Sequence, residues 1–442
     1  MANDVTRRDF LSDSSKLAAG SIAAVGLQQA SAVASTDQPV EIALIGCGGI
    51  MNHHARGFAK RKSNVHFRWL CDVDPKQIDS IDGHLDGFQT DAIKRATRYE
   101  DVLEDKNVEA VVIATPHHWH VPIAIAAMQA GKDVYVEKPI SHVFSEGPLM
   151  IKAARKYGRI VQHGTQMRSS PVKVEAEKLL KQGIIGEVKI ARAWTAEVRE
   201  VQKAVPDSDP PNNVDYDRWL GPAPKRPFNK TRFHRTWRVF RDYANGEIGD
   251  DGIHDIDMAV WGLGEKYMPK QITARGGIMK LHGHVSEYPD NMNVTYEYED
   301  GKLLIYENYP FTSYGLHGFD NGNVFYGTEG YMVFSRRGAF SVYLGPKSKP
   351  GPTESPEIRG NAGRGYDEHM ENFLECIRTR KPANARPEIG HSSSGLIHLG
   401  DIAYQTGQVL NFDGRKSRFT NNDAANDMLT KNYRKPYQLP EV

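Results

Sequence analysis

The chain has 442 residues, of which 39% are hydrophobic and 25% are charged, and its 56 basic and 55 acidic side chains leave a net charge of +1. This length is enough for two or three domains, each with its own core. The balanced charge gives no support for a nucleic-acid partner. Three cysteines, Cys47, Cys71 and Cys376, do not make a disulfide framework, and we expect them to be small buried side chains.

The amino-terminal residues have the features of a targeting segment. A twin-arginine motif at residues 6–11 is followed by apolar residues 17–27 and by small residues 30–34. This order predicts a removable twin-arginine (Tat) signal peptide over residues 1–34, cleaved near residues 32–35, rather than a disordered basic start. The apolar stretch is shorter than the ~20 residues of a transmembrane helix, so we expect no membrane anchor. The predicted location is the periplasm or the exterior, with the Tat export machinery as a partner.

A nucleotide-binding unit is predicted next. The β-type run Val40–Ile45 ends in a glycine turn, and the next β-type run, Val65–Leu70, ends in Cys71 and Asp72. A strand, a glycine turn and a helix start bring backbone N–H groups to a pyrophosphate, and an acidic residue about 20 positions later accepts hydrogen bonds from the adenosine ribose. Asp72 therefore favours NAD over NADP, with Asp74 as the fallback; the alternative is a glycine turn that binds nothing. The predicted contacts in the turn are Gly46, Cys47, Gly48, Gly49 and Ile50.

Two further strands lead to Lys138, the most informative residue. The run Ala110–Ala114 enters a loop with three histidines, and a helix over residues 121–130 precedes the apolar run that ends at Lys138. Both loops open at the carboxyl edge of a parallel sheet, where such sheets bind ligands. No cysteine or carboxylate lies at ligand spacing from the histidines, so we expect no metal. The predicted cofactor contacts in these loops are Thr115, Pro116, His120, Glu137 and Lys138.

A second cluster of polar residues lies far downstream. If a helix begins near Asp250, then Asp250, His254, Asp257 and Trp261 share one face. The simpler alternative is that Asp250 caps the helix and His254 is a core histidine. Polar groups on the face that carries a tryptophan indicate a desolvated acid–base site, in which the Asp250 carboxylate would hold the His254 ring.

Residues 225–241 interleave arginine and lysine with phenylalanine and tryptophan. Such a pattern could bind single-stranded nucleic acid, but it directly precedes the His254 helix, so a loop that contacts a polyol is more economical. A solvated loop without ligand contact stays open as an alternative. The candidate substrate contacts are Trp237 and Arg238 from this stretch, together with Arg168 and Asp257.

The remaining chain suits a second sheet. Strand-like runs at residues 188–194, 292–298, 302–308, 323–326 and 331–334 favour antiparallel pairing, and helices are predicted over Tyr366–Arg380 and His391–Leu410.

The glycine turn, the Thr115–His120 loop, the Glu137-Lys138-Pro139 run and the polar residues from Asp250 to Asp257 occur in this order. Together they resemble the Gfo/Idh/MocA oxidoreductase family over nearly everything after the leader. The resemblance implies an α/β fold, with an N-terminal Rossmann domain built on a parallel, doubly wound sheet and a C-terminal α/β domain built on a large, mostly antiparallel sheet. We place these domains at residues 37–165 and 166–442.

The resemblance also implies an activity. Members exchange a hydride between NAD(P) and a sugar or cyclitol carbon, and the residues that match Lys138, Asp250 and His254 act together at the reacting hydroxyl. A homo-oligomer, a dimer or a tetramer, is expected from the family. The residues suit this chemistry, because an imidazole accepts the hydroxyl proton and an ammonium stabilises the developing alkoxide. Glu137 is expected to orient Lys138 or to contact the nicotinamide ribose.

Two other classes of function stay open. A redox-neutral enzyme, which transhydrogenates two sugars or cleaves or epimerises one by transient oxidation, would need the same residues. A non-catalytic sugar-binding protein could keep the fold but would have little reason to keep these side chains. Because an exported enzyme has no dependable NAD supply, we expect NAD to be loaded before export and retained through many turnovers.

Overall fold

A computed structural model describes residues 38–61, 63–354 and 362–442. The predicted signal peptide and its cleavage site lie outside these residues. Within the described part of the chain, no helix is both long enough and apolar enough to cross a lipid bilayer.

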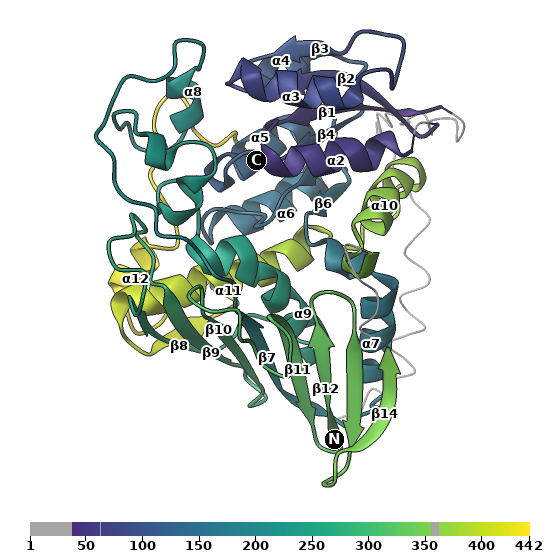
Figure 1. Cartoon of the computed structure of the whole chain (residues 1–442), viewed down its shortest axis with the longest axis vertical. Coiled ribbons are helices and arrows are strands. Elements are labelled where there is room, and N and C mark those ends of the chain that lie inside the picture. Colours follow the sequence, from purple (N-terminus) through teal and green to yellow (C-terminus); the bar gives the residue numbers. More distant parts are fainter. Residues whose placement is uncertain (1–37, 62, 355–361) are drawn as a thin grey trace, which may run out of the picture. The chain divides into compact units, whose positions relative to one another are not determined.

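The first half of the described chain forms a six-stranded, all-parallel sheet in the order β3-β2-β1-β4-β5-β6 (Figure 1). Its central strands are short apolar runs that are buried on both faces, as parallel strands between helical layers are. The order reverses between β1 and β4, which leaves a crevice at the carboxyl ends of these two strands. The strands are β1 (Val40–Ile45), β2 (Val65–Cys71), β3 (Lys94–Ala96), β4 (Ala110–Ile113), β5 (Asp133–Val136) and β6 (Val161–His163). The helices are α2 (Gly49–Ala59), α3 (Pro75–Leu85), α4 (Tyr99–Glu104), α5 (His120–Gln129) and α6 (Glu146–Tyr157).

The second half forms a ten-stranded sheet in the order β14-β13-β12-β11-β7-β10-β9-β8-β15-β16. All its neighbours are antiparallel except β7 and β10, which run parallel. The predicted fold class, a doubly wound parallel sheet followed by a large, mostly antiparallel one, is confirmed. The strands are β7 (Val188–Thr195), β8 (Gln271–Gly277), β9 (Asn291–Glu297), β10 (Leu303–Asn308), β11 (Asn321–Gly327), β12 (Gly330–Ser335), β13 (Phe340–Leu344), β14 (Lys349–Glu354), β15 (Leu410–Asp413) and β16 (Arg418–Phe419).

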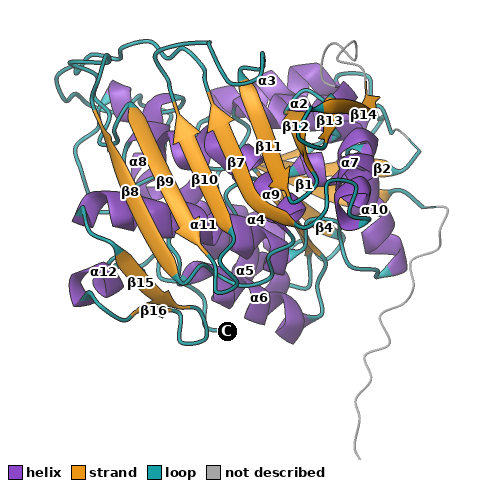
Figure 2. Ribbon diagram, turned by 90° about the horizontal axis from the view of Figure 1, so that it is seen from below, coloured by secondary structure: helices purple, strands orange, loops and turns teal. Residues whose placement is uncertain are grey.

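Helices cover one face of this sheet, and Figure 2 shows β8, β9, β10, β7 and β11 in front of them. The helices α9 (Ile253–Leu263) and α11 (Pro387–Thr406) pack on the covered face, where they bury aliphatic and aromatic side chains. The helix predicted over His391–Leu410 instead spans Pro387–Thr406, because Pro387 suits the first helical position and the left-handed Gly407 ends the helix before Leu410 enters β15. The other helices are α7 (Pro171–Lys181), α8 (Tyr216–Leu220), α10 (Tyr366–Thr379) and α12 (Asp423–Asp427).

Late segments of the chain return to complete the core around the first sheet. Met370 and Phe373 of α10 are buried against the face that holds Phe58. At the carboxyl terminus, Leu439 and Val442 pack against the opposite helical layer, and the Val442 carbonyl accepts a hydrogen bond from Lys152 Nζ at 2.7 Å. The Rossmann unit is thus continuous in space but not in sequence.

Candidate active site

The glycine turn after β1 has room for a phosphate. Gly46 has a φ of +85°, and a Cβ there would lie 2.7 Å from the backbone nitrogen of Thr115, so only glycine fits. Gly48 caps α2 without a side-chain hydrogen bond, and a Cβ on Gly48 or Gly49 would meet no atom within 4 Å. The first N–H groups of α2 therefore have no side-chain cap and remain available to an anion, which fits a dinucleotide pyrophosphate.

Asp72 lies beside this turn, at the end of β2. Its Oδ2 accepts a hydrogen bond from the Cys47 backbone N–H at 2.7 Å, and its Oδ1 accepts one from the Asp74 N–H at 2.9 Å. Burial raises the pKa of this carboxyl to about 6, although the two N–H donors oppose the rise. Each carboxylate oxygen has a further lone pair, so Asp72 can also accept from a ribose hydroxyl.

Both carboxylate oxygens of Asp74 bond other protein groups, which argues against Asp74 as the alternative ribose-binding residue. Its Oδ1 caps α3 by accepting from the Lys76 N–H at 3.0 Å, and its Oδ2 lies 3.1 Å from His234 Nε2.

His120 fastens together the two loops at the carboxyl edge of the sheet. Its Nδ1 lies 2.7 Å from the Pro139 carbonyl oxygen, and its Nε2 lies 2.9 Å from the Thr115 carbonyl oxygen. Burial lowers the pKa of His120, whereas the two carbonyl acceptors raise it. Both ring nitrogens are occupied, so this side chain positions the loops.

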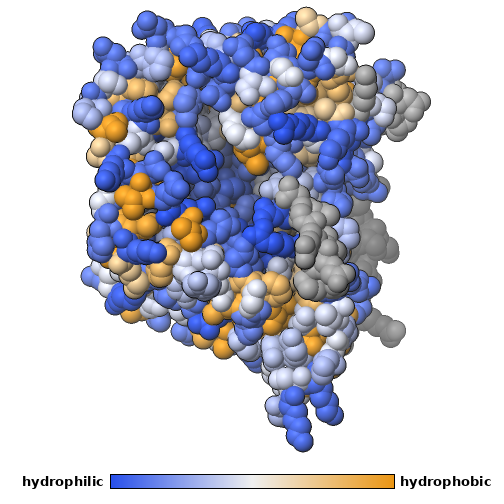
Figure 3. Space-filling model, in the orientation of Figure 1, coloured by the Kyte–Doolittle hydropathy of each residue, from blue (hydrophilic) through white to orange (hydrophobic). Residues whose placement is uncertain are grey.

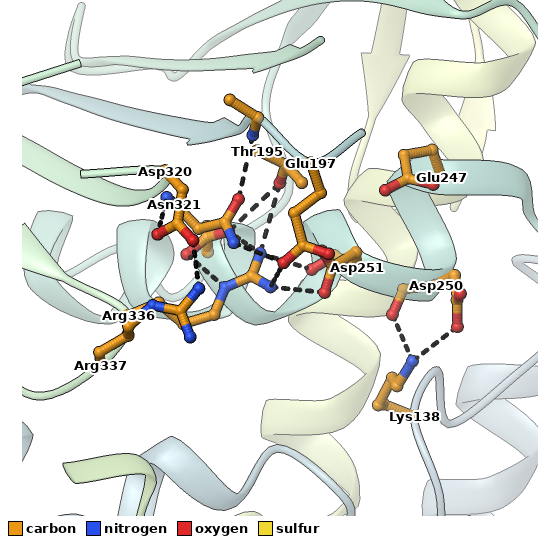
Figure 4. Close-up of polar contacts among 12 residues, drawn as sticks. Lys138, Thr195, Glu197, Glu247, Asp250, Asp251, Asp320, Asn321, Arg336 and Arg337 are labelled. Carbon is orange, nitrogen blue, oxygen red and sulfur yellow. Dashed lines mark hydrogen bonds and ion pairs between the residues drawn. The ribbon is translucent and has the colours of Figure 1, made fainter. Parts of the chain in front are cut away.

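The Lys138 ammonium is held by Asp250. Lys138 Nζ donates to Asp250 Oδ1 at 2.9 Å and also to the Asp250 main-chain oxygen (Figure 4). Arg238 Nε donates to the same Oδ1 at 3.0 Å. Burial alone would raise the pKa of Asp250, but the charges of Lys138 and Arg238 outweigh it and hold that pKa well below its usual range. The site therefore contains a carboxylate between two cations.

The predicted contact between Asp250 and His254 is wrong. Residues Ile248–Gly252 form a π-helical turn before α9, so a spacing of four residues no longer places Asp250 over the His254 ring. Within the described residues the ring has no hydrogen-bond partner, and its Nδ1 is enclosed. Burial lowers the pKa of His254 to about 3, with a further contribution from the charges of Lys138 and Arg336. The ring is thus neutral and able to accept a proton.

Arg336 supports the π-helical turn from the second sheet. Its Nη1 donates to Asp251 Oδ1 at 2.5 Å, and its Nε donates to Asp255 Oδ1 at 3.2 Å. Figure 4 shows this guanidinium surrounded by oxygen atoms. Burial would raise the pKa of Asp251, but Arg336 and its other cationic neighbours hold it below the usual range. The turn that carries Asp250 is therefore fixed by a buried ion-pair network.

Two adjoining cavities meet at these residues. The larger, of about 1170 Å³, is lined by the glycine turn, Asp72 and Thr115. The smaller, of about 200 Å³, is lined by Lys138 and His254. They share lining residues from both domains, so they form one continuous cleft. In the view of Figure 3 the surface is hollowed near the middle, and hydrophilic residues gather around the hollow.

One part of the second domain, which we call the covering segment (residues 213–239), contacts the first domain beside Asp72 and lines the larger cavity there. Arg218 of α8 places Nη1 at 2.9 and 3.0 Å from the two carboxylate oxygens of Glu100 on α4 (Figure 1). His234 lies 3.1 Å from Asp74, and the Asp215 N–H donates to the Val73 carbonyl at 3.2 Å. The side chains of this segment that line the cavity with Asp72 include Arg218, Trp219, His234 and Arg235.

The aromatic residues of the basic stretch serve mainly as a core for the covering segment. Phe228, Phe233 and Phe240 are buried in a cluster with Trp219 and Tyr243. Two side chains of this stretch, Trp237 and Arg238, line both cavities and remain the candidates for contact with a polyol.

The structure places most of the other predicted residues along the cleft. Gly46, Gly48, Gly49, Ile50, Asp72, Thr115 and Pro116 line the larger cavity, His120, Glu137, Lys138 and His254 line the smaller one, and Asp250 lines both. Cys47 is buried beneath the turn and contributes its N–H group.

Glu137, which was expected to orient Lys138 or to contact the nicotinamide ribose, bonds the main chain of Lys138, whereas the Lys138 ammonium is held by Asp250. Glu137 Oε1 lies 2.7 Å from His54 Nε2, and Glu137 Oε2 accepts from the Lys138 backbone N–H at 3.1 Å. Burial would raise the pKa of Glu137, but the hydrogen bond from His54 and nearby positive charges lower it to about 2.

Arg168 and Asp257 do not line either cavity. Arg168 Nε and Nη2 donate to the two Asp257 carboxylate oxygens at 2.8 and 3.0 Å, and the guanidinium lies 4.8 Å from the centre of the Trp261 ring. Asp257 is fully buried. This pair connects α9 to the segment after β6, and its geometry gives no support to substrate contact.

Several residues of the smaller cavity were not predicted. His117 and Asp251 lie in motifs that the sequence singled out, so their positions carried a signal. The others lie outside those motifs, and only the fold brings them to the site. They are Gln166, Met167, Arg336, Arg364 and Tyr366. Within the described ranges no group of three or more histidine, cysteine or acidic side chains is arranged to hold a metal ion.

The two halves of the chain match two family models. Residues 40–165 match an oxidoreductase family model described as an NAD-binding Rossmann fold. Residues 165–327 and 357–439 match a model described as an oxidoreductase family C-terminal alpha/beta domain.

Individual relatives extend over most of the chain. The uncharacterized oxidoreductase YrbE of Bacillus subtilis is 24% identical over 377 residues, which cover 84% of this chain and 94% of that protein. The inositol 2-dehydrogenase of Rhizobium meliloti is 24% identical over 373 residues, which cover 83% of this chain and 96% of the relative. Among solved structures, levoglucosan dehydrogenase in complex with NADH and levoglucosan superposes with a TM-score of 0.67 at 19% identity, covering 85% of this chain and 99% of that one.

Proposed function

The chain belongs to the Gfo/Idh/MocA family of NAD-binding oxidoreductases, and on that premise we propose that it oxidises a secondary hydroxyl group of a sugar, glycoside or cyclitol with an NAD that stays bound. The observation that carries this proposal is the shared cleft: Lys138, Asp250 and His254 line a small cavity that opens into the space beside the glycine turn and Asp72.

Each polar side chain of the smaller cavity has a separate role in the oxidation of an alcohol. Bound NAD supplies the hydride acceptor. The Lys138 ammonium stabilises the alkoxide that develops on the reacting oxygen, and Asp250 holds that ammonium in place at 2.9 Å. The neutral His254 ring accepts the hydroxyl proton. His54 and Glu137, joined at 2.7 Å, fix the backbone from which Lys138 projects.

The substrate class follows from the cavity and from the relatives. The smaller cavity, of about 200 Å³, is lined by charged and hydrogen-bonding groups and by the ring of Trp237, which suit the hydroxyls and the C–H face of one sugar ring. Relatives are named inositol 2-dehydrogenase and levoglucosan dehydrogenase, so both act on hydroxyl-rich rings.

Retention of NAD is supported by the covering segment. Its contacts with Glu100, Asp74 and the Val73 carbonyl lie over the side of the cleft that carries Asp72. A bound adenosine can leave only if these contacts open, so the off-rate falls far below that of an open Rossmann crevice.

Retention favours a second candidate function. An enzyme that keeps its cofactor must reoxidise it in place, either with a second carbonyl compound or within a redox-neutral reaction such as transhydrogenation between two sugars, glycoside cleavage or epimerisation.

We further propose export through the Tat pathway into the periplasm, as the amino-terminal motif predicts, and a homo-oligomer, dimer or tetramer. The sheet face opposite α9 and α11 is the surface that a second copy would cover (Figure 2).

One experiment tests the core of this proposal. The mature protein is purified from the periplasm, dialysed extensively and denatured, and the released nucleotide is quantified. We expect close to one NAD per chain, and we expect the near-ultraviolet absorbance of reduced nicotinamide to rise when D-glucose, methyl β-D-glucopyranoside, levoglucosan or myo-inositol is added. A protein that emerges empty and works only with added NAD would refute retention, and a panel without any reduction would refute the substrate class.

A further inference from the structure

One titratable group in the smaller cavity has no role in the reaction described above. Hydride removal from an alcohol releases one proton, and His254 and Lys138 already serve the oxygen that loses it. His117, in the short helical turn His117–Trp119 after β4, lines the same cavity and is 2% exposed. Its ring lies edge-on to Trp237, with the ring centres 4.9 Å apart.

The hydrogen bonds around His117 fix which ring nitrogen carries the proton. His117 Nδ1 lies 3.1 Å from Asn245 Oδ1, and Asn245 Nδ2 donates to the His142 carbonyl oxygen at 2.9 Å. That carbonyl can only accept, so the amide nitrogen must face it and the amide oxygen must face His117. Nδ1 of His117 is therefore the donor, and the lone pair of the neutral ring is on Nε2.

Nε2 of His117 is open. It has no hydrogen-bond partner among the described residues, and it is not enclosed, in contrast to Nδ1 of His254. His120, the third imidazole of this cavity, has both nitrogens on carbonyl oxygens and cannot act in this way. Burial lowers the pKa of His117 well below its usual range, and the charges of His120 and Lys138 add to the effect, so the ring is an acceptor at neutral pH.

The cavity thus holds two imidazoles with a free acceptor, one more than alcohol oxidation requires. We propose that His117 is a second catalytic base, which removes the proton from the carbon next to the ketone formed by the first oxidation. The inference rests on the proposed function, since only a ketone makes that C–H bond acidic enough.

The step balances within the site. The C–H bond breaks, the proton moves to His117 Nε2, and the electron pair becomes the C=C bond of an enolate. The negative charge moves to the former carbonyl oxygen, beside the Lys138 ammonium. Return of a proton to carbon, followed by return of the hydride to the ketone, restores both substrate and NAD. Reprotonation from the other face gives an epimer, and loss of a substituent from the next carbon gives elimination. No second oxidant is needed, which suits a retained cofactor.

The test separates proton removal from hydride transfer. The NAD-bound enzyme is mixed in D₂O with each of the four sugars named above, and two quantities are measured on the same sample: reduced nicotinamide by absorbance and deuterium at the carbon next to the oxidised one by NMR. His117→Gln keeps a polar side chain of similar size but has no base. We expect the exchange rate in this variant to fall by at least about 100-fold, while the rate of nicotinamide reduction falls by less than about tenfold.

His118→Gln is the matched control. His118 lies in the same helical turn and is also buried, but its Nε2 bonds the Trp219 carbonyl at 3.1 Å and it does not line the smaller cavity. Exchange and reduction should both match the parent enzyme. The inference is overturned if the parent enzyme reduces its nicotinamide without exchange, or if His117→Gln exchanges at the parent rate. If no sugar reduces the nicotinamide, the proposed function fails first, and the inference falls with it.

Discussion

The preference for NAD over NADP should depend on one carboxylate and on its state of protonation. Asp72 accepts hydrogen bonds from the N–H groups of Cys47 and Asp74 and lines the cavity that receives the adenosine. We predict that Asp72→Asn lowers the ratio of NADP to NAD dissociation constants to below about tenfold. Asparagine has the size of aspartate and keeps one acceptor oxygen for the turn but carries no charge. The substitution therefore isolates the electrostatic effect.

The size of the effect follows from the distances. A ribose hydroxyl that bonds Asp72 sits at hydrogen-bond distance, so a 2′-phosphate in its place would bring a second negative charge to within roughly 4 Å. At an effective dielectric constant of about 20, that repulsion is about 4 kcal/mol per pair of unit charges before screening. Movement of the phosphate reduces it, and we expect about 2 to 4 kcal/mol, or about 30- to 1000-fold, in the parent protein.

Acid should weaken this preference. Burial raises the pKa of Asp72 to about 6, so the carboxyl becomes neutral as the pH falls below that value and the repulsion is lost. The ratio of dissociation constants should therefore decrease between pH 8 and pH 5 in the parent protein. The 2′-phosphate also titrates near pH 6, but it does so equally with Asp72→Asn, whose smaller pH dependence provides the correction.

The assay is titration of nucleotide-free protein, prepared by partial unfolding and refolding, with NAD and NADP at each pH. Equal affinities of the parent protein for the two cofactors, or a variant that keeps the full preference, would show that Asp72 does not face the ribose.

Three further predictions concern catalysis, retention and stability. Replacing Lys138 or His254 with alanine should slow single-turnover nicotinamide reduction by about 10²- to 10⁴-fold. If the two side chains act on one proton, the double variant should be slowed by far less than the product of the two single effects. Near-normal rates in both single variants would contradict their roles. Arg218→Ala should shorten the half-life of bound NAD about tenfold, measured by exchange with radiolabelled NAD, because it releases α8 from Glu100; an unchanged half-life would exclude the covering segment as the barrier. Burial lowers the pKa of His398 to about 3, against about 6.5 in the unfolded chain. The contribution of the neutral His398 ring to stability is therefore present above pH 6.5 and is lost as the pH falls toward 3. The urea midpoint of the parent protein should drop more between pH 7 and pH 4.5 than that of His398→Gln, and an equal drop in the two proteins would contradict this prediction.

The fold and the centre of the site were predictable because local patterns specified them. The glycine turn, Asp72 and Lys138 each follow a short apolar strand, and parallel strands bring their carboxyl ends to one edge whatever the rest of the chain does. The motif around His254 was equally informative about location. The predicted contact between Asp250 and His254 was wrong because it assumed a helical period of 3.6 residues where the backbone forms a π-helical turn.

The rest of the site could not be predicted, because it depends on contacts between distant segments. Arg336 directly follows β12 of the second sheet, yet it holds the turn that carries Asp250. The pairing of Arg168 with Asp257 joins residues 89 positions apart and withdraws both from the cleft. A charged side chain near a motif has the same appearance in the sequence whether it meets a ligand or another side chain.

The return of α10 and of the last residues to the first sheet bears on how the protein is made. Ribosomes release the amino-terminal half first, but Phe373 and Leu439 are needed to cover the helices and strands of that half. At about 5 to 20 residues per second, synthesis from Thr165 to Val442 takes on the order of 15 to 55 s, during which apolar side chains of the Rossmann unit stay uncovered. The core of the Rossmann unit is therefore completed only when residues 366–442 have been synthesised, so its nucleotide site forms late in synthesis.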